Sequence, residues 1–223
     1  MVDQPKYGRI AESERLNEFI YHCFQSLKES EIAKFVNEFH NQPHDKTQVM
    51  HTLRELILGA YLSQLGLQMT HNYIIDAKTP DWCAMDETSQ PKYVIELVNF
   101  HPDTEMSADI VAQIREKGIW CNFVKPNTER IYHAIWEKAS KYKSLVSRNK
   151  LPYIVSVFGE FTSFLDEEEI NQCLFDEETG LFELYPEVSG LLYFEESFGI
   201  YYFTFKPNPF ADSRIEISSG TFR

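Results

Sequence analysis

No stretch of this 223-residue sequence is both long and uniformly apolar. A helix that crosses a membrane needs about 20 consecutive, predominantly apolar residues, and the apolar runs of this chain are far shorter. Residues 1–6 also lack the apolar segment of a secretory signal peptide. We therefore expect no membrane span and, by default, a cytoplasmic location.

The cysteines are too scattered to form a metal-binding or disulfide framework. Cys23, Cys83, Cys121 and Cys173 lie far apart, and no C-x-x-C pair occurs. Zinc knuckles and disulfide-rich secreted domains depend on closely spaced cysteines. The sequence therefore indicates neither class, and we expect buried, reduced thiols.

Basic residues are also scarce, since 21 lysines and arginines face 34 acidic residues and the net charge is −13. An acidic surface repels a phosphate backbone at long range. A nucleic acid is therefore only a weakly supported partner. A nuclease would need metal ions and a local basic patch to offset the repulsion between its acidic surface and the phosphates. A protein partner is the alternative, and the sequence does not indicate an oligomeric state.

Several common catalytic signatures are missing from the sequence. It contains no G-x-S-x-G elbow, no P-loop, no G-x-G-x-x-G and no H-E-x-x-H. The first belongs to serine hydrolases, the next two to nucleotide-binding proteins, and the last to zinc proteases. None of these functions is supported.

The chain nevertheless has what a folded domain needs. Hydrophobic residues make up 43% of it, enough for a substantial core at this length. Helical spacing of apolar residues predicts helices over 12–28, with Ser13 as the N-cap, and 30–41, so we expect residues 1–46 to form an N-terminal helical hairpin. We expect residues 47–223 to form an α/β domain, and the two parts to make a single compact unit overall.

In the second part, helical and strand patterns alternate. We predict a helix over 47–65 that ends at Gly66, followed by a strand over 67–75 and two further strand-like segments. Later patterns predict a weakly helical stretch over 105–118, a helix after Pro126 with Asn127 or Thr128 as its N-cap, and a strand at 151–158. A short helix from Asp166 and a hairpin over 190–205 complete the pattern. The predicted class is α/β (α+β), with a mixed central β-sheet flanked by helices.

One acidic residue stands where a core residue is expected. Glu96 lies in the run Lys92-Tyr93-Val94-Ile95-Glu96-Leu97-Val98, which otherwise suits a buried strand. An ionised carboxylate costs several kcal/mol to bury unless it is paired or binds a metal. Together with Asp81, at the start of the preceding strand-like segment, it would suit Mg²⁺ or Mn²⁺, which prefer oxygen ligands.

The residues Pro80-Asp81 and Glu96-Leu97-Val98 resemble the two halves of the PD-(D/E)xK nuclease motif. This resemblance implies a restriction-endonuclease-like fold, with Asp81 and Glu96 as metal ligands and catalytic residues and Glu55 as a further acid at the metal. A likeness at residues 137–142 extends it over about residues 50–160. It implies a Mg²⁺-dependent phosphodiesterase or nuclease.

The motif lysine is missing, because Val98 stands in its position. Lys92 is a candidate replacement, since it lies on the same strand face as Glu96. Other lysines that could approach are Lys78, Lys138 and Lys141. We therefore expect weak or lost nuclease activity, and the alternative is a non-enzymatic interaction or regulatory module on a nuclease-like fold.

The candidate residues also have ordinary interpretations. Glu55 could be a solvated helix glutamate or a partner of Arg54 or Lys78, and Asp81 could be a turn aspartate that binds its own backbone. His101 and His133 could face the cleft, although isolated histidines are more often surface or hydrogen-bonded core residues.

Overall fold

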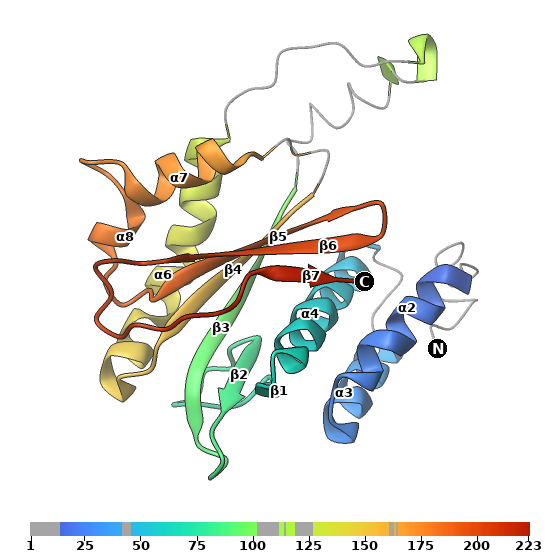
Figure 1. The fold of residues 1–223 in the computed structure, drawn as a ribbon, viewed down its shortest axis with the longest axis horizontal. Helices are drawn as coiled ribbons and strands as arrows, with labels where there is room; N and C mark the ends of the chain where they lie inside the picture. The colour runs from blue at the N-terminus through green and yellow to red at the C-terminus, as the bar shows by residue number, and fades with distance from the viewer. Residues whose placement is uncertain are drawn as a thin grey trace. The chain divides into compact units, whose positions relative to one another are not determined.

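The computed structural model describes residues 14–41, 46–101, 112–113, 115–118, 127–160, 163 and 165–223 (Figure 1). The chain divides into two compact units, residues 1–96 with Arg223 and residues 97–222. Within each unit, hydrogen-bonded strands follow one another in sequence order. The boundary between these units lies inside a strand.

The helices of the first unit agree with the apolar spacing. They are α2 (Glu14–Gln25), α3 (Glu29–Asn41) and α4 (Lys46–Gln64), and both α2 and α3 contact α4 (Figure 1). Buried side chains line α4 through most of its length, so this helix forms the centre of the unit's core. The predicted helices are confirmed within the described residues, and the residue predicted to cap the first, Ser13, lies outside them.

Helix α4 ends where glycine allows the chain to turn. Gly66 has a φ of 84°, and its N–H donates to the carbonyl of Ser63. The next N–H, of Leu67, reaches back to the carbonyl of Leu62. This left-handed end confirms the predicted role of Gly66.

Strand β1 (Gln68–His71) is shorter than the predicted strand over 67–75. Asn72 has a φ of 53°, and Asp76 and Ala77 have φ values of 48° and 63°. Positive φ values are incompatible with strand geometry. The chain instead turns, with Ile75 and Lys78 exchanging backbone hydrogen bonds.

Strands β2 (Trp82–Met85) and β3 (Pro91–Phe100) form an antiparallel hairpin. Strand β1 pairs antiparallel with the other edge of β2. The β2–β3 turn is organised by Asp86, whose Oδ1 accepts the N–H groups of Thr88 and Gln90. Both predicted strands are confirmed, and their pairing determines the arrangement of the acidic residues described below.

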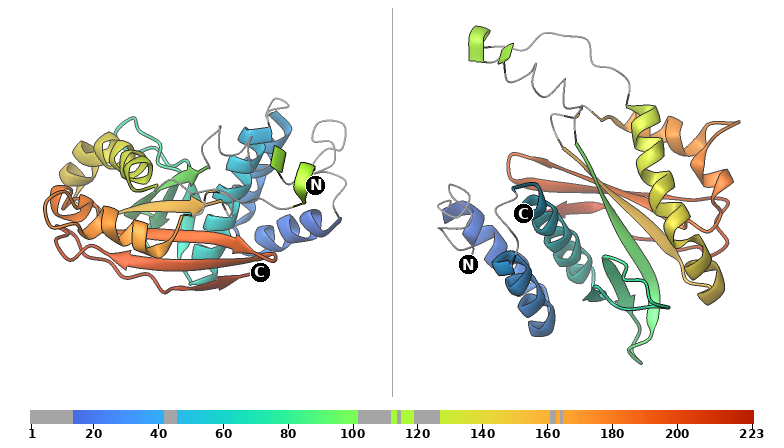
Figure 2. Two further views of the ribbon diagram at one scale, coloured as in Figure 1. Left: turned by 90° about the horizontal axis from the view of Figure 1, so that it is seen from above. Right: turned by 180° about the vertical axis from the view of Figure 1, so that it is seen from behind.

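In the second unit, α6 (Thr128–Asn149) contacts β4 (Tyr153–Gly159), as Figure 2 shows from behind. Every residue of β4 is buried, as the apolar pattern predicts. Asn127 occupies the predicted N-cap position, but its side chain does not cap the helix, because its Oδ1 accepts a hydrogen bond from the Arg130 guanidinium.

After β4, the described residues of the second unit form two helices and three strands. Helix α7 (Glu167–Phe175) is capped by Asp166, and α8 (Leu181–Leu184) follows. Strand β5 (Gly190–Ser197) is parallel to β4 and forms the predicted hairpin with β6 (Ile200–Pro207).

The last strand, β7 (Gly220–Phe222), pairs antiparallel with β6. The second unit therefore contains parallel and antiparallel neighbours, so the α/β class and the mixed sheet are confirmed. The pattern did not predict α8 or β7, and the weakly helical stretch expected over 105–118 lies largely outside the described residues. In the described part of the chain, no helix is long and apolar enough to cross a membrane.

Candidate functional site

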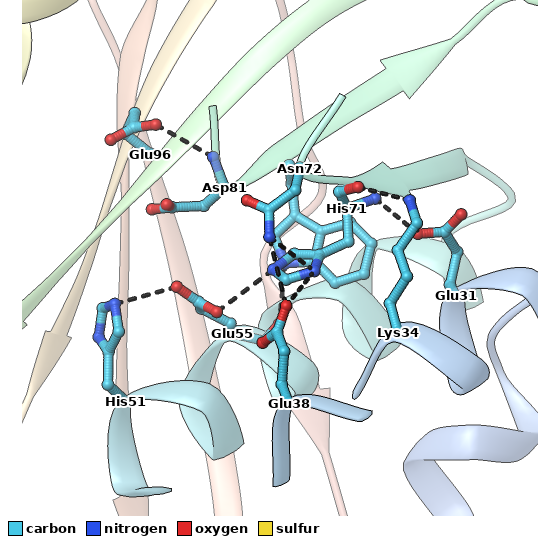
Figure 3. Close-up of polar contacts among 10 residues, drawn as sticks. Glu31, Lys34, Glu38, His51, Glu55, His71, Asn72, Asp81 and Glu96 are labelled. Carbon is cyan, nitrogen blue, oxygen red and sulfur yellow. Dashed lines mark hydrogen bonds and ion pairs between the residues drawn. The ribbon is translucent and has the colours of Figure 1, made fainter. Parts of the chain in front are cut away.

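The structure brings Asp81 and Glu96 together. Glu96 lies within β3 and has no exposed surface. Its Oε1 accepts a hydrogen bond from the backbone N–H of Asp81 at 3.0 Å (Figure 3). The hairpin register explains this contact. Trp82, the first residue of β2, lies opposite Ile95, so Asp81, which precedes β2, lies beside Glu96.

Glu55 joins this pair from helix α4. It is 7% exposed, and Figure 3 shows the Asp81 side chain extending to the side on which the carboxylates of Glu55 and Glu96 lie. All three belong to the first unit. Of the acids that the motif resemblance implies as metal ligands, Asp81 and Glu96 are therefore in contact, and Glu55 lies in the same unit.

Two histidines bind the Glu55 carboxylate. Nε2 of His51 lies 2.9 Å from Oε1, and Nε2 of His71 lies 3.2 Å from Oε2. Burial by itself would raise the pKa of Glu55, but hydrogen bonds and charge from the two histidines outweigh it and lower this pKa to about 2. Glu55 is therefore not a solvated helix residue, and these histidines are the partners that sequence reasoning missed.

His71 is buried at the end of β1. It is 1% exposed and stacks on Phe35 with the ring centres 4.4 Å apart. The Trp82 ring lies 5.0 Å away, and its indole N–H donates to the backbone carbonyl of Glu55. Aromatic packing therefore determines the position of this imidazole.

Glu38, on α3, completes a second group of potential metal ligands. One carboxylate oxygen of Glu38, one of Glu55 and a ring nitrogen of His71 all lie within 4.8 Å of one another. Burial raises the pKa of Glu38, and the charge of Glu55 adds to that effect against the opposing charge of His71. Glu38 was not among the predicted residues, since nothing in its local sequence distinguishes it from other helix glutamates.

The structure does not bring Lys92 to the Asp81–Glu96 pair. Lys92 lies four positions before Glu96 on β3, about 13 Å away along the strand. Lys92 is exposed and lines a cavity of about 680 Å³ beside the β2–β3 turn, together with Asp86. Val98, on the same face of β3 as Glu96, is buried.

The other lysines that could replace the motif lysine have the following surroundings. In the first unit, Lys78 is half-buried in the turn before Asp81. In the second unit, Lys141 lies over the ring of Tyr142, and the carbonyl of Lys138 accepts a hydrogen bond from Tyr153.

The two histidines considered from sequence both lie in the second unit. His101 pairs with Glu160 at 2.8 Å. His133 is exposed and lies 3.9 Å from Glu129, one turn earlier on α6. Both have the ordinary surroundings of partly or largely exposed histidines, and neither belongs to the group around Glu55.

Comparison with protein-family models, curated proteins and solved structures finds no match to this chain. The likeness to the PD-(D/E)xK superfamily therefore depends on the motif residues and on their arrangement. The site itself offers two kinds of donor set. Asp81 and Glu96 present oxygen alone, whereas the group around His71 adds an imidazole nitrogen.

Proposed function

We propose that this chain is a diverged PD-(D/E)xK-like protein, with a restriction-endonuclease-like fold, that binds Mg²⁺ or Mn²⁺ through Asp81, Glu96 and Glu55. One observation carries the proposal. Glu96 is completely buried in a strand, and its carboxylate is held beside Asp81 by a backbone hydrogen bond. A buried carboxylate near two further acids is costly without a cation, and hard divalent ions bind such oxygen sets.

The corresponding chemistry is metal-dependent hydrolysis of a phosphodiester. A bound ion would lower the pKa of a coordinated water and stabilise the charge on the phosphate. Val98 removes the lysine that the family motif places on this strand face, so the proposed activity is weak or lost. The net charge of −13 also makes nucleic acid a weakly held partner.

The second candidate is a non-enzymatic interaction or regulatory module on the same fold. Two observations favour it, namely Val98 at the lysine position and the location of Lys92 beside the β2–β3 turn. In this alternative the acids would have a structural role, and a protein would be the partner. We propose a cytoplasmic location for either function on the sequence grounds given above.

Metal-dependent stabilisation tests the proposal. With Mg²⁺ or Mn²⁺ at about 100 times its Kd, mass action adds about 2.7 kcal/mol, which raises Tm by about 5–10 °C in a protein of this size. Asp81→Asn and Glu96→Gln should each abolish the rise. Glu87→Gln is the matched control, because Glu87 is exposed in the turn of the same hairpin.

Cleavage of DNA and RNA substrates is measured in parallel. Metal stabilisation with little or no cleavage fits the proposed diverged enzyme. Strong cleavage that Glu96→Gln abolishes would show that the motif lysine is replaced or dispensable. The absence of both stabilisation and cleavage would overturn the proposal and leave the interaction module.

A further inference from the structure

We propose that Glu38, Glu55 and His71 form a second metal site, selective for a transition metal such as Zn²⁺, in addition to the oxygen-only site at Asp81 and Glu96. The three residues come from α3, α4 and β1, all within the first unit. Glu55 is shared between the two sites. The inference goes beyond the proposed nuclease-like function, since a Zn²⁺ site here requires no cleavage activity.

The spacing of the three side chains suits a shared ion. Nε2 of His71 and Oε2 of Glu55 are 3.2 Å apart, and a ligand atom from each of the three residues lies within 4.8 Å of the others. Two atoms that each lie about 2.1 Å from a tetrahedral ion are about 3.4 Å apart. The contact between Nδ1 of His71 and Oε1 of Glu38, at 3.5 Å, is longer than a normal hydrogen bond. One ion takes only one of the two ring nitrogens, so it would bind Nε2 of His71 beside Glu55, and the partly exposed Glu38 carboxylate would turn from Nδ1 toward that ion.

The donor types decide which ion fits. Imidazole is a good ligand for Zn²⁺ and similar transition metals, whereas Mg²⁺ prefers oxygen ligands and retains its water. One histidine with two carboxylates therefore favours Zn²⁺ at this group. The pair Asp81 and Glu96 presents only oxygen and favours the harder ions.

A supporting shell holds the proposed ligands in place. His51 binds the Glu55 oxygen that faces away from His71, and the amide of Asn72 donates to Glu38 at 3.3 Å. Phe35 stacks on the His71 ring. Hydrogen-bonded ligands of this kind are typical of functional metal sites, where the outer partners orient the first ones.

The backbone at His71 is attached to α3 as well. Its N–H donates to Oε2 of Glu31 at 2.8 Å, and Nζ of Lys34 donates to its carbonyl at 2.6 Å. Lys34 and Glu31 also pair with each other at 3.0 Å. These contacts keep the helix that carries Glu38 against the strand that carries His71, so the ligand geometry is prepared before any ion arrives.

The negative charge of the two carboxylates favours cation binding at this site. Glu55 is nearly buried, the Glu38 side chain is 30% exposed, and the His71 imidazole contacts both carboxylates. Two carboxylates so close together repel each other and lose hydration, and a divalent ion offsets both costs.

Isothermal titration of the purified chain with Zn²⁺ alone tests the proposal, with Co²⁺ absorption as a spectroscopic readout of nitrogen and oxygen coordination. We expect one Zn²⁺ per chain with His71 as a ligand. Glu38→Gln should weaken binding at least about tenfold. The control is Glu29→Gln, the same chemical change at an exposed position of α3, which should leave Zn²⁺ affinity unchanged.

A crossed comparison separates this site from the proposed Mg²⁺ site. Asp81→Asn should abolish Mg²⁺ or Mn²⁺ stabilisation and leave Zn²⁺ binding intact, while Glu38→Gln should weaken Zn²⁺ binding and leave the Mg²⁺ or Mn²⁺ stabilisation intact. Glu55 variants are not used, because both sites share that residue. Loss of one response without the other therefore shows which of the two proposals fails.

Two results would overturn the inference. One is a folded wild-type chain that binds no Zn²⁺. The other is Zn²⁺ binding of equal affinity in the wild type, Glu38→Gln and His71→Gln, which would place the ion at surface residues. If His71→Gln fails to fold, the comparison of wild type with Glu38→Gln decides the outcome. Glu38 is partly exposed and its amide replacement keeps the shape of the side chain, so this variant should fold.

Discussion

The backbone N–H of Asp81 donates a hydrogen bond to the carboxylate of Glu96 at 3.0 Å. This single contact links two acidic residues on neighbouring strands and gives the buried Glu96 carboxylate a partner. The structural role of Glu96 and its proposed metal-binding role can be tested separately. The amide oxygen of a glutamine at this position could accept the same hydrogen bond without carrying charge.

Two substitutions at Glu96 should therefore differ in their effects. Glu96→Gln keeps the acceptor for the Asp81 N–H and removes a buried charge, so we expect the metal-free Tm to remain within a few degrees of wild type. Glu96→Ala removes the acceptor and leaves a cavity, which should cost about 2–4 kcal/mol. Thermal melts without metal measure both. Equal destabilisation by the two variants would contradict this account of the hydrogen bond.

Val98→Lys restores the residue that the family motif has on the Glu96 face of β3. If the site binds metal as proposed, we expect cleavage of plasmid DNA to rise at least about 100-fold. Val98 is 7% exposed, so the buried ammonium should also lower stability by several kcal/mol. Val98→Met is the control, since it has a similar length and no charge. Unchanged cleavage by a folded Val98→Lys protein would favour the interaction module.

Gly59→Ala should be strongly destabilising, although alanine normally stabilises the interior of a helix. A Cβ at position 59 would lie 1.9 Å from the Trp82 ring. That ring is held by its hydrogen bond to the carbonyl of Glu55, so we expect a cost of at least about 3 kcal/mol in urea denaturation.

A double-mutant cycle provides the control for the Gly59 prediction. Trp82→Phe removes the ring atoms nearest to the new Cβ, so Gly59→Ala should cost much less in that background. Additive effects of the two substitutions would show that the steric conflict is not the cause.

Glu55 should make the chain sensitive to acid. Its folded-state pKa is lowered to about 2, against about 4.3 in an unfolded chain. The unfolded state therefore takes up a proton first as the pH falls, and the stabilisation present above pH 4.3 is lost on the way to pH 2. The wild type should lose about 3 kcal/mol more than Glu55→Gln between pH 5 and pH 2. Urea melts across this range measure the difference, and parallel losses would contradict it.

Much of the local structure followed from the sequence because local interactions decide it. The apolar spacing of α3, α4 and α6 predicted those helices, and Gly66 marked the end of α4 as expected. The strand after α4 was predicted too long. Its residues include strand formers, but positive φ values at Asn72 and Asp76 turn the chain, and asparagine and aspartate are the non-glycine residues that most readily adopt them.

Part of the candidate site was also predictable. Asp81 and Glu96 directly precede and follow the paired residues of the β2–β3 hairpin. Pairing of these two segments brings them together whatever the rest of the chain does. The contact between His51 and Glu55 was equally accessible, because residues four apart on a helix are neighbours. It was overlooked because only the acid was compared with the family motif.

The group of Glu38, Glu55 and His71 belongs to the tertiary structure alone. Its members lie on two helices and a strand, and nothing in their local sequences links them. They meet because α3 and α4 pack against each other and against β1, which buries Phe35 and Trp82 beside the His71 ring. The sequence determined the hairpin that joins Asp81 to Glu96, since that pairing is short-range. Long-range burial of apolar side chains decided which histidine and which second glutamate meet Glu55.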